Sequence, residues 1–208
     1  MQRLLSQIGR SQRLTVVNHL KRSAEGLPVA VLAARLGMSY MGVKQHCLDL
    51  ERDGYVDTFR RHRGVGRPEL LYRLTAKAQD LFPQADNFLT ISLLEQARKL
   101  FGAGAPEKIL YLHFQEKAAG YTERVTGEPL VERVQALVRL RDREGHMAEF
   151  ADEPLRIVER HQPILGLMEA FPVIAGMERD LFQRVLGAPV RREASQTGGN
   201  YECVFWVG

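Results

Sequence analysis

The stretch SYMGVKQHCLDLERDG, residues 39–54, carries the pattern that decides the fold of the first part of the chain. Ser39 is a favourable N-cap residue and Gly54 is typical of the position after a helix end, so the stretch predicts a helix over 40–53. Three residues at i, i+4 and i+7 predict its buried face: Val43, Cys47 and Leu50. The side chains left facing outward are those of Tyr40, Met41, Lys44, Gln45 and Leu48.

Short periodic segments surround this helix. Apolar residues at helical spacing predict two helices before it, over 13–23 and 29–36. After it, alternating residues predict two strands of a β-hairpin, over 55–59 and 70–74. The connecting residues 60–68 are basic and rich in glycine. Three helices followed by a hairpin of this kind predict a winged helix-turn-helix domain.

The charge of the chain is divided unevenly. The 208 residues carry a formal net charge of +4, but residues 1–82 hold 14 Lys and Arg against 7 Asp and Glu. The remainder holds 15 against 18. A basic first part joined to a mildly acidic second part predicts a polyanion-binding module attached to a part that does not bind polyanions. The alternative is that the basic run at 60–67 is a solvent-exposed loop without a binding role.

The winged-helix pattern predicts double-stranded DNA as the partner. We expect the N-terminal half of the helix over 40–53 to enter a major groove, and the hairpin arginines to contact phosphates and a minor groove. The expected DNA-contacting residues are Ser39, Tyr40, Met41, Lys44, Gln45, His46, Arg60, Arg61, Arg63, Gly66 and Arg67. For His46, packing against a neighbouring helix is an equal alternative. Cys47 is expected to be a core residue rather than a redox sensor.

The middle of the chain, residues 84–145, predicts helices over 87–101, 106–121 and 130–142. Apolar residues of the first of these helices cover more than one stripe, so we expect it to be buried on more than one side. Next to a DNA-binding domain such a helix serves as a dimer interface or as an ordinary core helix, and the sequence leaves both open. We assign 84–145 as a helical dimerisation and linker region and expect a homodimer.

The last part of the chain, residues 146–208, predicts a small α+β domain that serves as a sensor or in oligomerisation. Strands are expected over 147–151, 155–160, 190–195 and 201–207, and helices over 163–170 and 175–186. The predicted fold class is therefore α+β throughout. It comprises a winged helix-turn-helix over 1–83, the dimerisation helices, and this C-terminal domain.

Motifs at both ends of the chain carry a resemblance to a known family. At the front they are VKQH at 43–46, LERDGYV at 50–56, GVGRPE at 64–69 and YRLT at 72–75. At the back they are QPI at 162–164, FP at 171–172, Glu178, LF at 181–182, VLG at 185–187, and Gly199-Asn200 with Cys203. Over nearly its whole length the chain resembles the winged-helix repressors of bacterial iron–sulfur (Suf) operons, a branch near the ArsR and DeoR types. The resemblance implies a dimer that represses from an inverted-repeat operator, and a C-terminal domain that senses a cluster held by cysteine thiolates.

The chain departs from that family at the ligand positions. Gln162 and Ala175 stand where the family has its first two cysteines, and only Cys203 is kept. Because Gln and Ala supply no thiolate, we expect neither an iron–sulfur cluster nor another cofactor. One alternative stays open, a zinc or iron site built from Cys203, His161 and His146. Without a metal, we expect these to be a core cysteine beside two partly exposed histidines.

Other classes of function find little support. The sequence holds no nucleophile–base set, paired-carboxylate motif or phosphate-cradling loop, so we expect no enzyme. Two cysteines make no disulfide framework, and no stretch reads as a signal peptide or a membrane span, so we expect a cytoplasmic protein. The expected function is a homodimeric DNA-binding transcriptional repressor, with an unidentified small-molecule effector left open. The alternative is a winged-helix module that contacts another protein.

Overall fold

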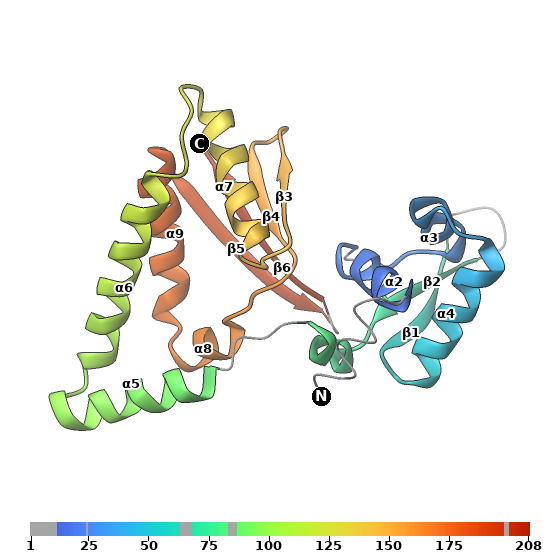
Figure 1. The fold of residues 1–208 in the computed structure, drawn as a ribbon, viewed down its shortest axis with the longest axis horizontal. Helices are drawn as coiled ribbons and strands as arrows, with labels where there is room; N and C mark the ends of the chain where they lie inside the picture. Colours follow the sequence, from blue (N-terminus) through green and yellow to red (C-terminus); the bar gives the residue numbers. More distant parts are fainter. Residues whose placement is uncertain (1–11, 24, 63–67, 83–86, 198–199) are drawn as a thin grey trace. The chain divides into compact units, whose positions relative to one another are not determined.

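The computed structural model describes residues 12–23, 25–62, 68–82, 87–197 and 200–208 of an α+β protein. The chain divides into two compact units (Figure 1). The first comprises Met1–Phe82 with Gln196–Tyr201, and the second comprises Pro83–Ser195 with Glu202–Gly208. None of the helices in the described ranges is both long and apolar enough to cross a membrane.

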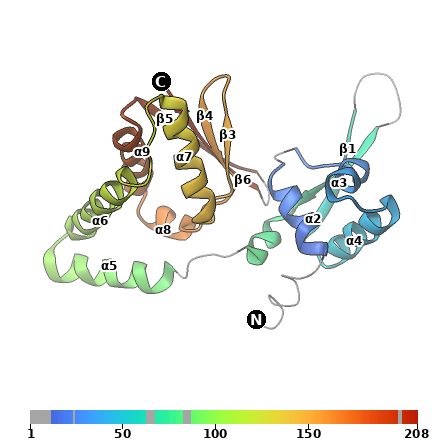
Figure 2. The ribbon, with the colours of Figure 1, turned by 45° about the horizontal axis from the view of Figure 1, so that its top comes forward.

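In its described residues, the first unit holds three helices followed by a two-stranded antiparallel hairpin (Figure 2). Its elements are α2 (Gln12–Lys21), α3 (Val29–Leu36), α4 (Tyr40–Arg52), β1 (Val56–Arg61), β2 (Glu69–Leu74) and the 3₁₀ helix η1 (Ala76–Leu81). The predicted core face of α4 is confirmed, because its three buried side chains are those of Val43, Cys47 and Leu50. The core of this unit also contains buried residues of α2, α3, β1 and β2: Val16, Val17, Leu20, Leu32, Val56, Leu71 and Leu74.

The base of the hairpin is tied to the segment that joins α2 to α3. Leu27 and Tyr72 exchange two backbone hydrogen bonds of 2.9 Å, so Tyr72 of β2 is flanked by Leu27 on one side and by β1 on the other. Gly26 makes this approach possible. Its φ is +75°, and a Cβ built on it would lie 2.6 Å from the carbonyl oxygen of Tyr72. Only glycine fits both the left-handed backbone and the close contact.

The second unit is a four-stranded sheet in the order β3-β4-β6-β5 with helices on one face (Figures 1 and 2). Its elements are α5 (Asn87–Phe101), α6 (Ala105–Thr122), α7 (Leu130–Arg143), β3 (Ala148–Ala151), β4 (Arg156–Glu159), α8 (Leu165–Ala170), α9 (Val173–Leu186), and most of β5 (Val190–Thr197) and β6 (Asn200–Val207), whose adjoining ends belong to the first unit. Helix α7 packs on β3 and β4, and the ring of Phe182 in α9 lies 4.3 Å from that of Phe205 in β6. Helix α6 packs along α9, and α5 contacts α6 and α8.

The structure joins the expected linker region 84–145 and the C-terminal region 146–208 in one unit, because α6 and α7 pack on the later elements. It also corrects the prediction that α5 is buried on more than one side. Only Leu94 of α5 is buried, while five large apolar side chains are exposed: Phe88, Leu89, Leu93, Leu100 and Phe101. Within one chain, α6 and α8 cover part of the helix and leave the rest to solvent.

Replacing Gly26 by alanine tests the contact between the α2–α3 segment and the hairpin. We expect Gly26→Ala to lower the free energy of unfolding of the first unit by at least about 2 kcal/mol, since strain and a backbone clash add. Gly37→Ala is the matched control. Gly37 has φ +60° and nothing within 4 Å of a built Cβ, so it carries only the left-handed penalty of about 1 kcal/mol. Native-state hydrogen exchange of the α4 amides measures both, and equal losses would contradict the clash.

Candidate functional site

The outward face of α4 collects the residues that the sequence singled out. Tyr40 and Met41 in its first turn are 52% and 69% exposed, and Lys44 one turn later is exposed as well. Ser39 does not stand free beside them. Its Oγ accepts a hydrogen bond of 3.1 Å from the backbone N–H of Gly42, so the hydroxyl caps the helix.

Two further polar residues of this face have partners within the protein. The Gln45 amide donates to Asp49 Oδ1 over 3.2 Å, and His46 Nε2 lies 3.1 Å from Gln12 Oε1. Asp49 also accepts from Arg13 over 2.7 Å, which ties α4 to α2. The contact to α2 favours the helix-packing alternative for His46 over a phosphate contact. Among the polar groups on this face, the Lys44 ammonium group and the Tyr40 hydroxyl therefore have the fewest contacts within the protein.

The hairpin arginines also differ in whether their side chains have partners within the protein. Arg60 and Arg61 lie in β1 itself rather than in the connecting segment, because the strand extends two residues beyond its predicted end. Arg60 is exposed, whereas Arg61 is ion-paired with Glu25 at 2.6 Å and with Glu69 at 3.3 Å. The predicted residues Arg63, Gly66 and Arg67 lie outside the described ranges.

Cys47 behaves as a core residue. Its side chain is fully buried in α4, and burial, with a smaller contribution from the charge of Glu51, raises the pKa of the thiol to about 11. The reactive thiolate is therefore scarce at neutral pH. This agrees with the expected packing role and disfavours redox sensing at this position.

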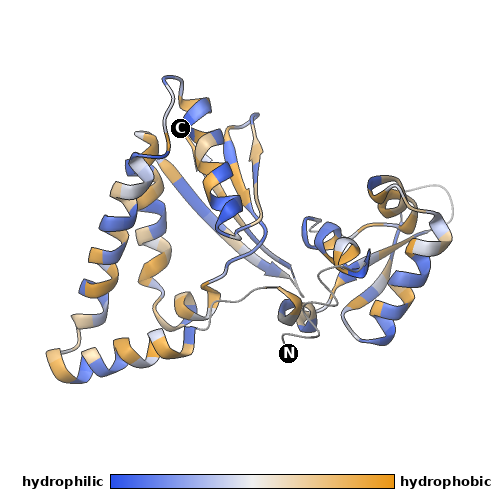
Figure 3. Cartoon of the chain, viewed as in Figure 1, coloured by the Kyte–Doolittle hydropathy of each residue, from blue (hydrophilic) through white to orange (hydrophobic). Residues whose placement is uncertain are grey.

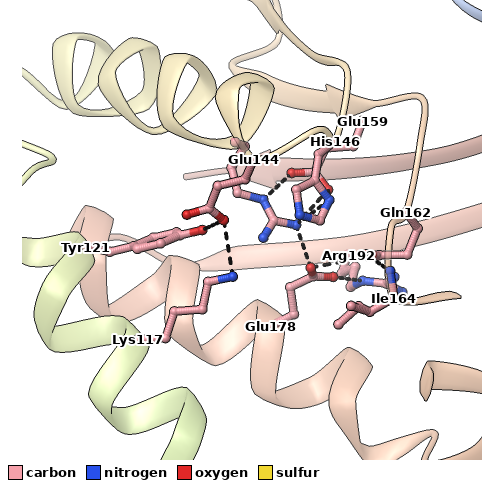
Figure 4. A network of polar contacts seen from close by, with 10 residues as sticks. Lys117, Tyr121, Glu144, His146, Glu159, Gln162, Ile164, Glu178 and Arg192 are labelled. Atoms are coloured by element: carbon pink, nitrogen blue, oxygen red, sulfur yellow. Dashed lines mark hydrogen bonds and ion pairs between the residues drawn. The ribbon is translucent and has the colours of Figure 1, made fainter. Parts of the chain in front are cut away.

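In the second unit, an arginine inside the core binds two buried carboxylates. Figure 4 shows these carboxylates, which belong to Glu159 and Glu178, among the polar contacts around them. Arg141 of α7 donates from Nε to Glu159 Oε1 at 2.6 Å and from Nη2 to Glu159 Oε2 at 2.9 Å. The same Nη2 lies 2.6 Å from Glu178 Oε1 of α9 and 3.0 Å from His146 Nδ1. Arg192 of β5 donates to the other oxygen of Glu178 over 3.3 Å. We call Arg141, His146, Glu159, Glu178 and Arg192 the buried ionic network.

The network pairs its opposite charges in the interior of the unit, where water does not solvate them. Two guanidinium groups face two carboxylates, and Arg141, Glu159 and Glu178 are each at most 3% exposed at the side chain. Burial by itself would raise the pKa of Glu159, but the charge of Arg141 and its hydrogen bonds outweigh burial and lower that pKa to about 2. Burial opposes the charge of Arg141 too, yet the two glutamates hold its pKa well above the ordinary value. Both partners therefore stay ionised at neutral pH.

The structure separates the three residues of the alternative metal site. In the described part of the chain, the group of metal-binding side chains with ligand atoms within 4.8 Å of one another is His146, Glu159 and Glu178, without Cys203 or His161. Both histidines are buried, at 4% and 3% exposure, which corrects the expectation that they are partly exposed. They are enclosed because the turn after α7 and the end of β4 pack on each other, with His161 donating its backbone N–H to His146 O. Since Arg141 hydrogen-bonds all three members of that group, a cation of the protein already takes the place of a metal.

An iron–sulfur cluster, which the family resemblance implies, does not fit these residues. Gln162 donates through Nε2 to Glu178 Oε1 at 3.4 Å, and Ala175 lines a pocket with Arg192. Cys203 is fully buried in β6 opposite Glu159. All three positions thus adjoin the buried ionic network, and one thiolate beside an amide and a methyl group is not a ligand set for a cluster.

The buried ionic network was not predicted from the sequence, although the sequence contains one signal of it. Arg141 follows Val134 and Leu137 at i+7 and i+4, so it continues the buried stripe of α7. A charged residue in such a stripe indicates a buried partner of opposite charge. The sequence does not reveal which glutamates provide it, because Glu159 and Glu178 come from other elements.

No protein-family model matches this chain, and a search of curated proteins finds no match.

Arg141→Met tests the network. We expect it to lower the free energy of unfolding of the second unit by about 3–5 kcal/mol, because it leaves buried carboxylates without their cation. Trp206, the single tryptophan of the chain, lies in β6 and reports urea unfolding of this unit by fluorescence. Arg139→Met is the matched control, since Arg139 is an exposed residue of the same helix and its loss should cost within about 0.5 kcal/mol.

The difference between wild type and Arg141→Met should depend on pH. Glu159 has a lowered pKa in the folded state, so its pairing stabilises the fold above the ordinary carboxyl value of 4.5 and is lost as the pH falls toward 2. We expect the difference to be largest at alkaline pH and to shrink as the pH falls, first because burial raises the pKa of the unpaired Glu159 in the variant, and under acid because the wild-type pairing is lost as well. A loss no larger than that of Arg139→Met at neutral pH would show that the network does not hold this unit together.

Proposed function

We propose that this protein is a homodimeric, sequence-specific DNA-binding regulator that represses transcription from an inverted-repeat operator. Its first unit would act as a winged helix-turn-helix, with α4 as the recognition helix and the β1–β2 hairpin as the wing. The observation that carries the proposal is the construction of α4. One face is locked into the core, and the other presents exposed Tyr40, Met41 and Lys44 in its N-terminal half. A recognition helix presents its N-terminal half to base edges in this way.

The charge of the first unit supports a polyanion as its partner. Residues 1–82 carry twice as many basic as acidic residues, and four of the arginines fall within 60–67. Arg60 in β1 is exposed at the start of this run. Phosphate contacts need exposed cations of this kind, and they provide most of the sequence-independent affinity of DNA-binding proteins. The family resemblance of both chain ends points to the same function.

The exposed face of α5 supports a second copy of the chain as partner. Figure 3 shows hydrophobic residues along the length of α5, and five of them are 61–80% exposed: Phe88, Leu89, Leu93, Leu100 and Phe101. Helix α6, which contacts α5, adds exposed Ile109, Tyr111 and Leu112. Soluble monomers rarely leave so many large apolar side chains in water, and an inverted-repeat operator requires two-fold symmetry in the protein.

The second unit would work without an iron–sulfur cluster. The buried ionic network occupies the neighbourhood of all three cysteine positions of the family, and it gives this unit a cross-link that needs no cofactor. A regulator built this way would answer to another signal, such as a small-molecule effector, or repress constitutively.

A salt series on the full chain tests DNA binding. We expect duplex affinity to fall steeply between 50 and 200 mM salt, because each phosphate contact releases counterions. Arg60→Ala should lower the slope of log affinity against log salt by about 0.9, the value for one phosphate contact. Fluorescence anisotropy with a labelled duplex gives both slopes.

Arg73→Ala is the control for this measurement. Arg73 lies on the same hairpin, but its guanidinium donates two hydrogen bonds to Asp57, so the variant loses the same charge without a free phosphate ligand. We expect a smaller change of slope. No duplex binding at low salt would reject the proposed function and favour the alternative, a winged-helix module that contacts a protein.

Leu93→Glu tests the homodimer. A charge in the middle of the exposed α5 face should raise the dimer dissociation constant about 30-fold, as expected for the loss of a central apolar contact. Val173→Glu also replaces an exposed apolar side chain by a charge, but in α9 and outside the α5 face, and should leave association unchanged. Sedimentation velocity across a concentration series distinguishes the two. A wild-type protein that stays monomeric throughout would reject this part of the proposal.

A further inference from the structure

The exposed face of α4 is unusually apolar for a helix surface that would meet a polyanion. Met41 is 69% exposed, Tyr40 is 52% exposed, and Leu48, two turns after Met41, is 42% exposed. None of these side chains contributes to the core of the first unit, which takes Val43, Cys47 and Leu50 from the same helix. Phosphate binding gives no reason for a methionine at the most exposed position of the first turn.

The polar residues nearby are less able to read base edges than their types suggest. The Ser39 hydroxyl accepts from Gly42, the Gln45 amide donates to Asp49, and His46 pairs with Gln12. Each of these contacts restricts how the group can turn toward a base, although the Ser39 hydroxyl and the Gln45 amide keep a further donor or acceptor. Met41 has no hydrogen bond of this kind to lose. Lys44, three residues later in the same helix, is exposed as well and supplies positive charge that attracts the phosphates of a duplex.

We propose that Met41, with Tyr40 beside it, recognises the 5-methyl group of thymine in the major groove. That methyl is the apolar group that the base pairs present there, and it distinguishes thymine from the other bases without a hydrogen bond. The inference rests on the proposed function and deepens it. The operator would carry thymine at the positions that face the first turn of α4, in each half-site.

Replacing thymine by uracil tests this directly, because it removes the methyl group and keeps every hydrogen-bonding atom. Duplexes bound by the 208-residue chain are first selected from a random pool, and each thymine of the selected site is then replaced singly by uracil. We expect wild-type affinity to fall about fourfold at one or more positions in each half-site, the effect of one buried methyl or methylene group.

Met41→Ala should abolish this discrimination at the same positions, so that thymine and uracil duplexes bind equally. Leu48→Ala is the matched control. Leu48 lies on the same helix, seven residues or about 10 Å further along the axis, and its loss should leave the fourfold preference intact. Met41 is exposed, so the variant should fold, and unchanged circular dichroism would verify that it does.

The possible outcomes distinguish a failure of the proposed methyl contact from a failure of the proposed DNA binding. If the wild type selects and binds a duplex but no uracil replacement weakens binding, the methyl contact is wrong and the proposed function stands. If uracil weakens binding equally for wild type and Met41→Ala, another residue reads the methyl and the assignment to Met41 is wrong. If no duplex is selected from the pool, the proposed function fails and this inference fails with it.

Discussion

Two glutamates placed inside an apolar core require a cation next to them, and Arg141 meets that requirement in the second unit. Its guanidinium binds both oxygens of Glu159 and one oxygen of Glu178, so one side chain joins α7, β4 and α9. A buried charge without its partner costs several kcal/mol, which makes the position of each of these elements depend on the other two. Arg192 and Gln162 extend the same set of contacts to β5 and to the segment before α8. The sheet and its covering helices are thus fixed by directional contacts as well as by apolar packing.

The first unit depends on a different feature: its helix α4 faces the core on one side and solvent on the other. The residues of α4 that face inward are apolar and fully used by the core, and those that face outward are free of it. The Ser39 cap, the Asp49 contacts to α2 and the Thr58–Glu51 hydrogen bond to β1 hold the helix without using Tyr40, Met41 or Lys44. A surface whose rigidity comes from elsewhere loses little conformational entropy on binding. This is the property that a recognition surface needs.

How much the sequence predicted depends on how local the determining interaction is. The core face of α4 followed from three residues of one helix, and the order of helices and strands followed from equally local patterns. The ends of β1 did not, because Arg60 and Arg61 have no apolar alternation that separates strand from loop. The burial of α5 was predicted wrongly because periodicity shows which side chains are apolar and not which element covers them. The buried ionic network was missed because its members are 18 and 37 residues apart along the chain.

The bridge between Leu27 and Tyr72 has a consequence for the DNA that this protein is proposed to bind. The bridge places Leu27 beside Tyr72 on the side away from β1, so the base of the two-stranded hairpin is hydrogen-bonded to the segment between α2 and α3. We expect this bridge to restrict the length that separates the exposed side of α4 from the hairpin arginine Arg60. A duplex that does not match this length must itself bend or change its groove width. Base steps that the protein never touches would then influence affinity through their stiffness.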